Sequence, residues 1–388
     1  MEAHPEASQR TGDSAPTLAR LAYYFLRLGT FGFGGPIALA AYMQRDLVER
    51  RGWIGAEDFK QGLALAQLAP GPLAAQLAIY LGWIRGRLLG ATVVALAFIL
   101  PSFVMVLGLA ALYVHFGGLS WMQGVFYGVG AAVIAVIARS AWKLGKSTLG
   151  KRWLLWGVAS ANAAVVALTE REIIWLFLAS GALVLVAEHP RSIKSMVVMP
   201  PWLLTGIGGI ATSSTLLKLL LFFAQAGAVV FGSGLAIVPF MHGGVVNDHH
   251  WLTDQQFLDA VAVAMITPGP VVITVAFIGY LVAGPLGATA AALGVFLPCY
   301  LFVVIPAPFY RRIADNQRIK AFVDGVTAAA AGAIAGAAIV LARRAIVDIP
   351  AALLAIGTFA AVTLLKKLPE PLVILAAGAI GFALWSVR

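Results

Sequence analysis

Charged residues are scarce in this chain. Asp, Glu, Lys and Arg make up 11% of its 388 residues, whereas 61% are hydrophobic and the mean hydropathy is +0.90. A globular protein needs far more polar surface than this in water. Apolar windows of about 17 to 25 residues recur along the chain, and each can cross a bilayer as a helix. They lack the alternation of barrel strands. The composition therefore predicts an all-α polytopic membrane protein.

Cysteine is nearly absent, since Cys299 is the only one. A single cysteine excludes an internal disulfide and a cysteine metal cage, and in FLPCY we expect a small core residue. His242, Asp248, His249 and His250 could suggest a metal site, but no further His or Cys supports them nearby. A solvated loop explains these four residues better. We therefore expect no metal and no cofactor.

Catalytic motifs are missing as well. The sequence has no P-loop pattern and no paired nucleophile and base, which argues against an ATP-driven pump and against an enzyme. The net charge of +10 does not indicate nucleic-acid binding, because Lys and Arg fall in short loops where they set membrane orientation. Residues 1–17 are polar and lack the apolar core of a signal peptide, so we expect a disordered tail.

The chain contains an internal repeat at an offset that drifts from 200 to 197 residues. The aligned residues are Phe31 with Phe231, Gly32 with Gly232, Trp53 with Trp251, Pro70-Gly71-Pro72 with Pro268-Gly269-Pro270, Gly82 with Gly279, Pro101 with Pro298 and Gly128 with Gly325. We therefore expect a first membrane repeat at 18–190, a linker at 191–214 and a second membrane repeat at 215–388.

The positively charged loops change sides between the repeats. Residues 45–60 contain four Lys or Arg, whereas the equivalent HGGVVNDHHWLTDQQFLD has none; YVHFGGLSWMQG has none, whereas YRRIADNQRIK has four. Because short loops rich in Lys and Arg stay in the cytoplasm, the repeats are predicted to cross the membrane in opposite directions. The expected spans are 20–44, 88–113, 122–142, 153–168, 173–188, 215–241, 287–306, 321–342, 351–365 and 371–387, with re-entrant hairpins at 59–84 and 256–281. Both termini then lie outside, although a full span in place of a hairpin would move the N-terminus inside.

Each repeat interrupts its apolar helices with Pro and Gly at matching places. A proline inside a helix costs about 3 kcal/mol or more, and lipid offers no water to repair the damage. One explanation is that these residues only kink the spans and let helices pack closely. We favour a transport site, because matching interruptions in two repeats are typical of one. Exposed half-helix N-termini at mid-membrane favour an anion.

The residues predicted to bind this anion lie in and beside the interruptions: Gly32, Gly34, Gly35, Pro36, Gln67, Pro70, Gly71, Pro72, Gln76, Gly232, Ser233, Gly234, Thr267, Pro268, Gly269, Pro270 and Thr274. Pro36, Pro72 and Pro270 are expected to begin the second half-helix of each break. The Gln and Thr side chains would supply neutral donors, or else only hold helices together.

Four charged residues are candidates for anion attraction or coupling. Arg45 and Arg85 are explained first by membrane orientation, with anion capture as the alternative. Arg27 lies one to two turns before the first break, where it either snorkels or faces the anion path. Asp324 lies early in an apolar run, which makes it either a functional carboxylate or an interfacial one. Asp259 can be explained as a helix cap.

Several motifs are specific in combination: FGFGGP, VERRGW, LAQLAPGP and LPS in the first repeat, and FGSG, WLTDQQFLDAVAVAMITPGPVVIT and FIGYLVAG in the second. In these motifs, which span nearly everything from 20 to 345, the chain resembles the chromate ion transporter (CHR) family in its long two-domain form. The resemblance implies a carrier in the bacterial inner membrane that expels chromate, driven by the proton-motive force. In many relatives the first break resembles GGPxAH, but here Leu39 stands where histidine is usual.

The function predicted from the sequence is a secondary active transporter that exports chromate, a divalent tetrahedral oxyanion. The alternatives are a carrier of sulfate or another oxyanion, a passive anion channel, and a scaffold subunit. The expected partners are the oxyanion and the lipid bilayer, without nucleic acid, and a homodimer is one option for the assembly.

Overall fold

The structure is a computed structural model that describes residues 16–33, 35–116, 120–170, 173–189, 214–229, 237–309, 316–346, 348–365 and 370–385. Within these ranges the chain is helical and contains no strand, which confirms the all-α fold class. Residues 1–15 of the predicted tail and 191–213 of the predicted linker lie outside the described residues.

The first repeat begins with a broken span. Its elements are α1 (Leu18–Phe31), α2 (Gly35–Met43), the π-helix η1 (Gln44–Arg50), α3 (Ala56–Leu68), α4 (Leu73–Phe116), α5 (Ser120–Leu149), α6 (Trp153–Thr169) and α7 (Ile174–Glu188). The span predicted at 20–44 is therefore two helices, and the interruption falls at the glycine-rich segment after Phe31.

The second repeat follows the same order. Its elements are α9 (Thr215–Val229), α10 (Ile237–His242), the π-helix η4 (Gly243–Asp248), α11 (Asp254–Ile266), the 3-10 helix η5 (Val271–Ile273), α12 (Thr274–Val304), the 3-10 helix η6 (Ala307–Phe309), α14 (Gln317–Ala345), α15 (Ile349–Leu364) and α16 (Glu370–Trp385). The two matching series of helices confirm the predicted duplication.

Each Pro-Gly-Pro segment stands at the tip of a re-entrant hairpin. In the first repeat α3 runs to the tip and the start of α4 runs back, until the chain turns at Gly86 and Arg87 with φ/ψ of −145°/25° and 50°/−136°. Ala283 and Gly284 make the same turn in α12, with φ/ψ of −146°/32° and 60°/−154°. Both predicted hairpins are therefore present.

The chain crosses itself closely around these turns. A Cβ on Gly82 would lie 2.4 Å from the carbonyl oxygen of Gly90, and a Cβ on Gly279 would lie 2.3 Å from that of Gly287. Any larger residue would push the two backbones apart. Glycine occupies all four aligned positions because both repeats fold this segment in the same way.

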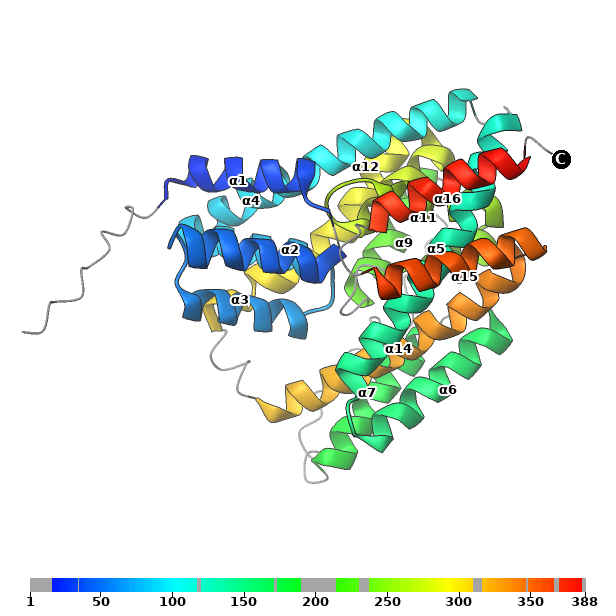
Figure 1. The fold of residues 1–388 in the computed structure, drawn as a ribbon. Coiled ribbons are helices and arrows are strands. Elements are labelled where there is room, and N and C mark those ends of the chain that lie inside the picture. Colours follow the sequence, from blue (N-terminus) through cyan, green and yellow to red (C-terminus); the bar gives the residue numbers. More distant parts are fainter. Residues whose placement is uncertain are drawn as a thin grey trace, which may run out of the picture.

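The two repeats interlock. α14 of the second repeat packs on α6 and α7 of the first, while α5 of the first packs on α15 and α16 of the second (Figure 1). A Cβ on Gly332 would lie 2.0 Å from the carbonyl oxygen of Ala159, and one on Gly128 would lie 2.0 Å from that of Ala377. Each repeat therefore covers helix faces that belong to the other.

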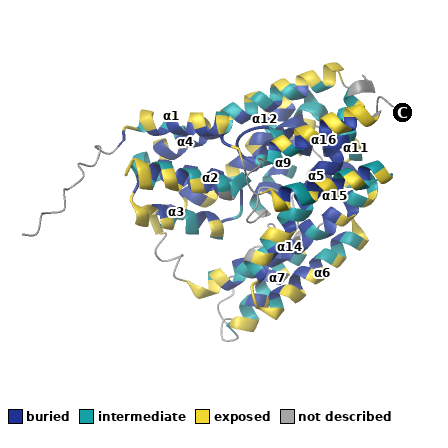
Figure 2. Ribbon diagram, viewed as in Figure 1, coloured by how far each residue is buried: buried dark blue, intermediate teal, exposed yellow. Residues whose placement is uncertain are grey.

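The outer surface is apolar, as a lipid-facing surface must be. Four helical stretches are long and apolar enough to cross a membrane: Leu73–Phe116, Met122–Lys146, Val271–Phe309 and Gln317–Ala345. Exposed leucines occupy aligned positions on two of them: Leu89, Leu96 and Leu100 on α4, and Leu286, Leu293 and Leu297 on α12. Figure 2 shows exposed residues along the outer faces of the peripheral helices, with buried residues inside. Exposing so much leucine to water would be unfavourable, so these helix faces are expected to contact lipid.

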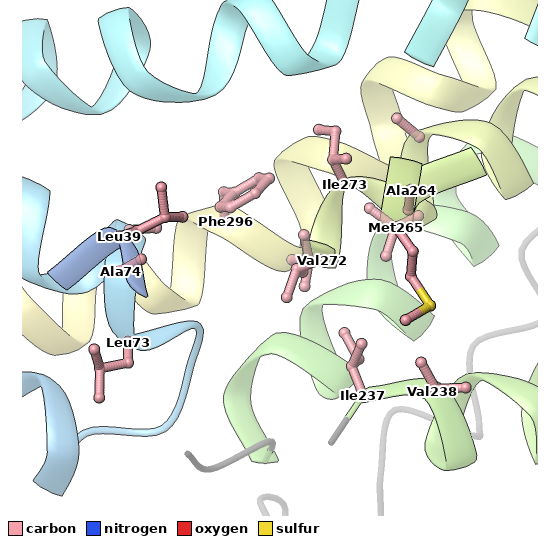
Figure 3. Close-up of a cluster of buried hydrophobic side chains, with 14 of the residues drawn as sticks. Leu39, Leu73, Ala74, Ile237, Val238, Ala264, Met265, Val272, Ile273 and Phe296 are labelled. Carbon is pink, nitrogen blue, oxygen red and sulfur yellow. The ribbon is translucent and has the colours of Figure 1, made fainter. Parts of the chain in front are cut away.

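One buried apolar cluster joins the repeats around the hairpin tips. Leu39 and Leu73 come from the first repeat, and Met265, Val272 and Phe296 come from the second (Figure 3). Leu39, at the position where the family resemblance leads us to expect a histidine, is 1% exposed. This side chain fills the core beside the first break, so it provides no titratable group there.

Candidate anion-binding site

The interruptions of the two repeats meet inside the molecule. The backbone N–H of Gly269, in the second Pro-Gly-Pro, donates to the carbonyl oxygen of Gly32, in the first glycine-rich break, at 2.9 Å. Gly269 has a φ of +99° and Gly71 a φ of +134°, which L residues with a side chain rarely adopt. Unwound backbone from both repeats therefore lies at one place, as the sequence predicts.

Each Pro-Gly-Pro packs against the opposite repeat. A Cβ on Gly269 would lie 1.9 Å from the Ser102 Oγ, and one on Gly71 would lie 2.8 Å from the Cys299 Sγ. Ser102 donates to the Gly29 carbonyl at 3.3 Å. Cys299 makes the aligned contact in the other repeat, where its Sγ lies 3.7 Å from the Gly227 carbonyl oxygen. The tips are therefore fixed by two equivalent contacts.

Side chains close to the tips bind backbone. The Gln76 Nε2 donates to the Pro70 carbonyl at 2.5 Å, and Gln76 is fully buried. The hydroxyl of Thr267 donates to the Val263 carbonyl at 2.6 Å. The Thr274 hydroxyl donates to the Val271 carbonyl at 2.8 Å. Gln76 and Thr274 thus stabilise the hairpin tips through hydrogen bonds to their backbone carbonyls.

A cavity of about 660 Å³ lies between the interruptions. The first repeat lines it with Gly32, Phe33, Gly35, Pro36, Ala64, Gln67, Leu68 and Leu73, and the second with Met265, Thr267, Gly269 and Val271. Two half-helices, α2 and α4, begin on this wall, where the three-residue 3-10 helix η5 also begins. Their unpaired N–H groups carry partial positive charge, which favours an anionic guest.

The wall also contains six charged residues. Arg139 and Lys143 lie on α5, Arg152 immediately precedes α6, and Lys320 lies on α14. Asp324 of α14 and Glu370 of α16 add two carboxylates. Arg139 binds Glu370 at 2.7 Å, and Arg152 binds Asp324 at 2.7 Å. Among the described residues, neither lysine forms an ion pair. The wall therefore carries a net charge of two positive, which matches a divalent anion.

The cavity reaches one end of the helix bundle, which we call the basic end because these four cations lie there. α14 runs from Lys320 at the basic end to Arg344 at the opposite end, which we call the far end, over about 36 Å at 1.5 Å per residue. At the far end Arg344 binds Asp254 and Glu170. The His242 Nε2 lies 2.7 Å from the Asp254 Oδ1. At the far end, beyond the cavity, Arg344 of the second repeat thus binds Glu170 of the first.

The predicted site residues other than the three arginines fall into three groups. Those on the cavity wall are Gly32, Gly35, Pro36, Gln67, Thr267, Gly269 and Asp324. Those in the hairpin tips but off the wall are Pro70, Gly71, Pro72, Gln76, Pro268, Pro270 and Thr274. Gly34, Gly232, Ser233 and Gly234 lie outside the described residues.

The three predicted arginines lie away from the cavity wall. Arg27 is exposed on α1. Arg45 lies 3.2 Å from Asp46, and Arg85 donates from its Nε to the Pro16 carbonyl at 2.7 Å. None of the three lines the cavity in this conformation, so their part in anion attraction stays a prediction.

Sequence reasoning missed the four cations on the wall because it treated them as loop charges. The structure extends α5 to Leu149 and begins α14 at Gln317, so these residues lie on helices or at their ends. A usable signal was present: Arg139 and Lys143, like Lys320 and Asp324, are four residues apart and share a helix face.

Comparison with known proteins agrees with this geometry. A family model described as chromate transporter matches residues 19–185 and 217–382, one match per repeat. A chromate transport protein of Cupriavidus metallidurans is 59% identical over 94% of this chain and 92% of its own length. A probable chromate transport protein of Synechococcus elongatus is 54% identical over 96% and 97%, and a chromate transport protein of Pseudomonas aeruginosa is 34% identical over 97% and 95%. No solved structure matches the chain. The family match to both repeats, with relatives this similar over nearly the whole length, shows that the chain belongs to the chromate transporter family of membrane transporters and is not an enzyme.

Proposed function

We propose that this protein is a secondary carrier that exports chromate from the cytoplasm of a bacterium across its inner membrane. The observation that carries the proposal is the cavity between the interruptions, where half-helix N-termini and a net charge of two positive surround space for a divalent oxyanion. The relatives named as chromate transport proteins support chromate as the substrate.

The orientation of the cavity supports export as the direction of transport. Lys and Arg concentrate at the basic end, and the positive-inside rule assigns such an end to the cytoplasm. In this conformation the anion would therefore enter from the cytoplasm. Moving a dianion out of a cell with a negative interior is favoured by roughly 4.6 kcal/mol at 100 mV, so export needs no ATP.

Two alternatives keep the same architecture. The first is that sulfate or another tetrahedral oxyanion is the main substrate, since charge and shape alone do not separate it from chromate. The second is a passive anion channel, which would use the interruptions as a filter. Uphill flux separates a carrier from a channel, because a channel cannot move an anion against its electrochemical gradient.

Inverted membrane vesicles provide the test. Radiolabelled chromate uptake is measured at imposed pH and voltage gradients, with sulfate as competitor. We expect saturable uptake that exceeds electrochemical equilibrium and that excess sulfate reduces only weakly. Absence of chromate uptake under every gradient would refute the proposal that chromate is the substrate. Uptake that never exceeds equilibrium would refute the proposal that the protein is a carrier.

The unpaired lysines allow a sharper prediction. Lys143→Ala or Lys320→Ala removes a cation that faces the cavity without a carboxylate partner among the described residues. Loss of about 1 to 2 kcal/mol of attraction should raise the KM for chromate roughly tenfold in each variant. Lys218→Ala, an exposed lysine on α9 away from the cavity, is the matched control and should leave KM unchanged. Equal KM values in all three variants would show that the two lysines do not contribute to anion binding.

A further inference from the structure

A buried carboxylate lies in the second hairpin, outside the cavity. Asp259, in the middle of α11, is 3% exposed. Its Oδ2 accepts from the Tyr113 hydroxyl at 2.8 Å, and its Oδ1 accepts from the Gln255 Nε2 at 2.9 Å. The ring of Tyr113 packs against Phe126 and Phe277, with centroids 5.5 and 5.3 Å apart. The carboxylate is therefore held by two neutral donors in an aromatic environment.

Asp259 does not cap its helix. Thr253 is the N-cap of α11, and it forms a capping box with Gln256. Asp259 lies six residues after this cap, more than a full turn further on, so the capping explanation that the sequence allowed is wrong. A buried carboxylate that lies on a membrane hairpin and does not cap a helix is a candidate for binding or transferring an ion or a proton.

No cation neutralises this carboxylate within the part of the chain that the structure describes. α5 and α16 pack on α11, but their Arg139 and Glu370 bind each other beside the cavity. α10 brings His242, which contacts Asp254. η4 brings Asp248, a like charge near the far end.

The remaining elements that contact α11 add no positive partner. α12 and η5 contain no Asp, Glu, Lys or Arg. From α4, Tyr113 contacts the carboxylate, whereas Arg85 binds the Pro16 carbonyl, Arg87 lies over the Trp83 ring and His115 packs on Phe116. An ionised carboxylate in an apolar site is costly without a cation, whereas the neutral acid is not. Asp259 can therefore alternate between an anion held by two donors and a neutral acid.

Its position suits a proton that enters from the far end. At 1.5 Å per residue, Asp259 lies about 7.5 Å along α11 from Asp254 in the far-end ion pairs and about 9 Å from Met265 on the cavity wall. It thus lies between the cavity, which reaches the basic end, and the far end, which ion pairs hold together.

The first repeat has no equivalent carboxylate. The alignment of Trp53 with Trp251 and of the two Pro-Gly-Pro segments places Gln61 opposite Asp259. The helices and hairpins are matched between repeats, but this ionisable group is not. A difference of this kind is expected of a group that serves coupling and not the shared fold.

We propose that Asp259 is the proton-binding group that couples export to the proton-motive force. The carboxylate takes a proton from water at the far end when that end opens, and releases it to the cytoplasm when the cavity again reaches the basic end. The inference rests on the proposed function, because it needs an anion whose export the proton drives.

The test uses the full-length protein in proteoliposomes with two readouts. Exchange of labelled for unlabelled chromate at equal pH needs no net proton movement, whereas uphill accumulation driven by a pH gradient does. Asp259→Asn should keep exchange within about twofold of wild type and lose gradient-driven accumulation at least tenfold. Asp58→Asn, an exposed carboxylate on the matching helix α3, should keep both.

A direct readout of protonation does not depend on the substrate. Infrared difference spectra of the purified protein between acidic and alkaline pH should contain a protonated carboxyl band that Asp259→Asn removes and Asp259→Glu moves. Gradient-driven accumulation that survives Asp259→Asn, or the absence of such a band, would overturn the proposal. If wild type does not exchange chromate at all, the proposed function fails, and the infrared titration still decides whether Asp259 binds a proton.

Discussion

Two glycines at the hairpin tips show how single residues determine this site. Gly71 and Gly269 both have positive φ, and both lie against a side chain of the opposite repeat. The repeat alignment identifies them from sequence, because the same Pro-Gly-Pro occurs twice. The partner side chains, Cys299 and Ser102, could not be identified in this way, since contacts between repeats depend on how the whole bundle packs.

Replacement of Gly269 by alanine should destabilise the protein. The positive φ alone costs roughly 1 to 3 kcal/mol for a residue with a Cβ, and the new Cβ would collide with the Ser102 Oγ. We expect a lower melting temperature in detergent, partly restored in Gly269→Ala with Ser102→Ala, which removes the collision and keeps the strain. Gly108→Ala, at an open position on α4, is the control. Equal melting temperatures for the two single alanine variants would contradict this reading of the tip.

At the scale of helices, the sequence predicts most elements within a few residues. Apolar runs define the spans, and Pro and Gly define the hairpin tips, because both signals are local. The prediction ended one span at residue 142, whereas α5 continues to Leu149. Lys143 and Lys146 looked like loop charges because lipid would not accept them. Lys143 is tolerated on a helix because it faces the cavity, which a one-dimensional pattern does not reveal.

Two helices from different repeats are held together at both ends. Arg152, just before α6, binds Asp324 on α14 at the basic end, and Glu170, just after α6, binds Arg344 of α14 at the far end. The glycines of α14 let the helices touch between these points.

The far-end cluster should respond to pH in a defined range. Burial would raise the pKa of Asp254, but hydrogen bonds from His242 and Arg344 outweigh it and hold the pKa below its usual value. A carboxyl whose pKa is lowered by folding stabilises the protein above its unfolded pKa, about 3.9, and loses this contribution as pH falls through the folded pKa. The melting-temperature difference between wild type and Asp254→Asn should thus not shrink as pH falls from 8 to 5, and should shrink below about pH 4. A difference that already shrinks between pH 7 and 5 would be inconsistent with this assignment.

At the scale of the whole molecule, the structure has one accessible side. The cavity reaches the basic end, and at the far end Arg344 of the second repeat binds Glu170 of the first. Inverted repeats allow the cavity of such a molecule to open alternately to the two sides of the membrane, as one repeat moves against the other. The sequence predicts the inversion through its loop charges, but which side is open in a given conformation depends on side-chain packing and could be found only in the structure.

The central claim is that the cavity between the interruptions is the anion path and opens to the cytoplasm. Gln67 lines this cavity and is exposed within it. Cys299→Ser, which copies the aligned Ser102, removes the only native thiol, and Gln67→Cys then places one in the cavity. Leu96→Cys, on the lipid-facing side of α4, is the control.

The decisive measurement labels these variants with a bulky, membrane-impermeant thiol reagent before chromate is added. The account predicts that Gln67→Cys is labelled in inverted vesicles but not in right-side-out ones, and that labelling lowers chromate flux at least tenfold, whereas Leu96→Cys vesicles keep their flux. Labelling of Gln67→Cys from the opposite side only, or full labelling without loss of flux, would contradict it.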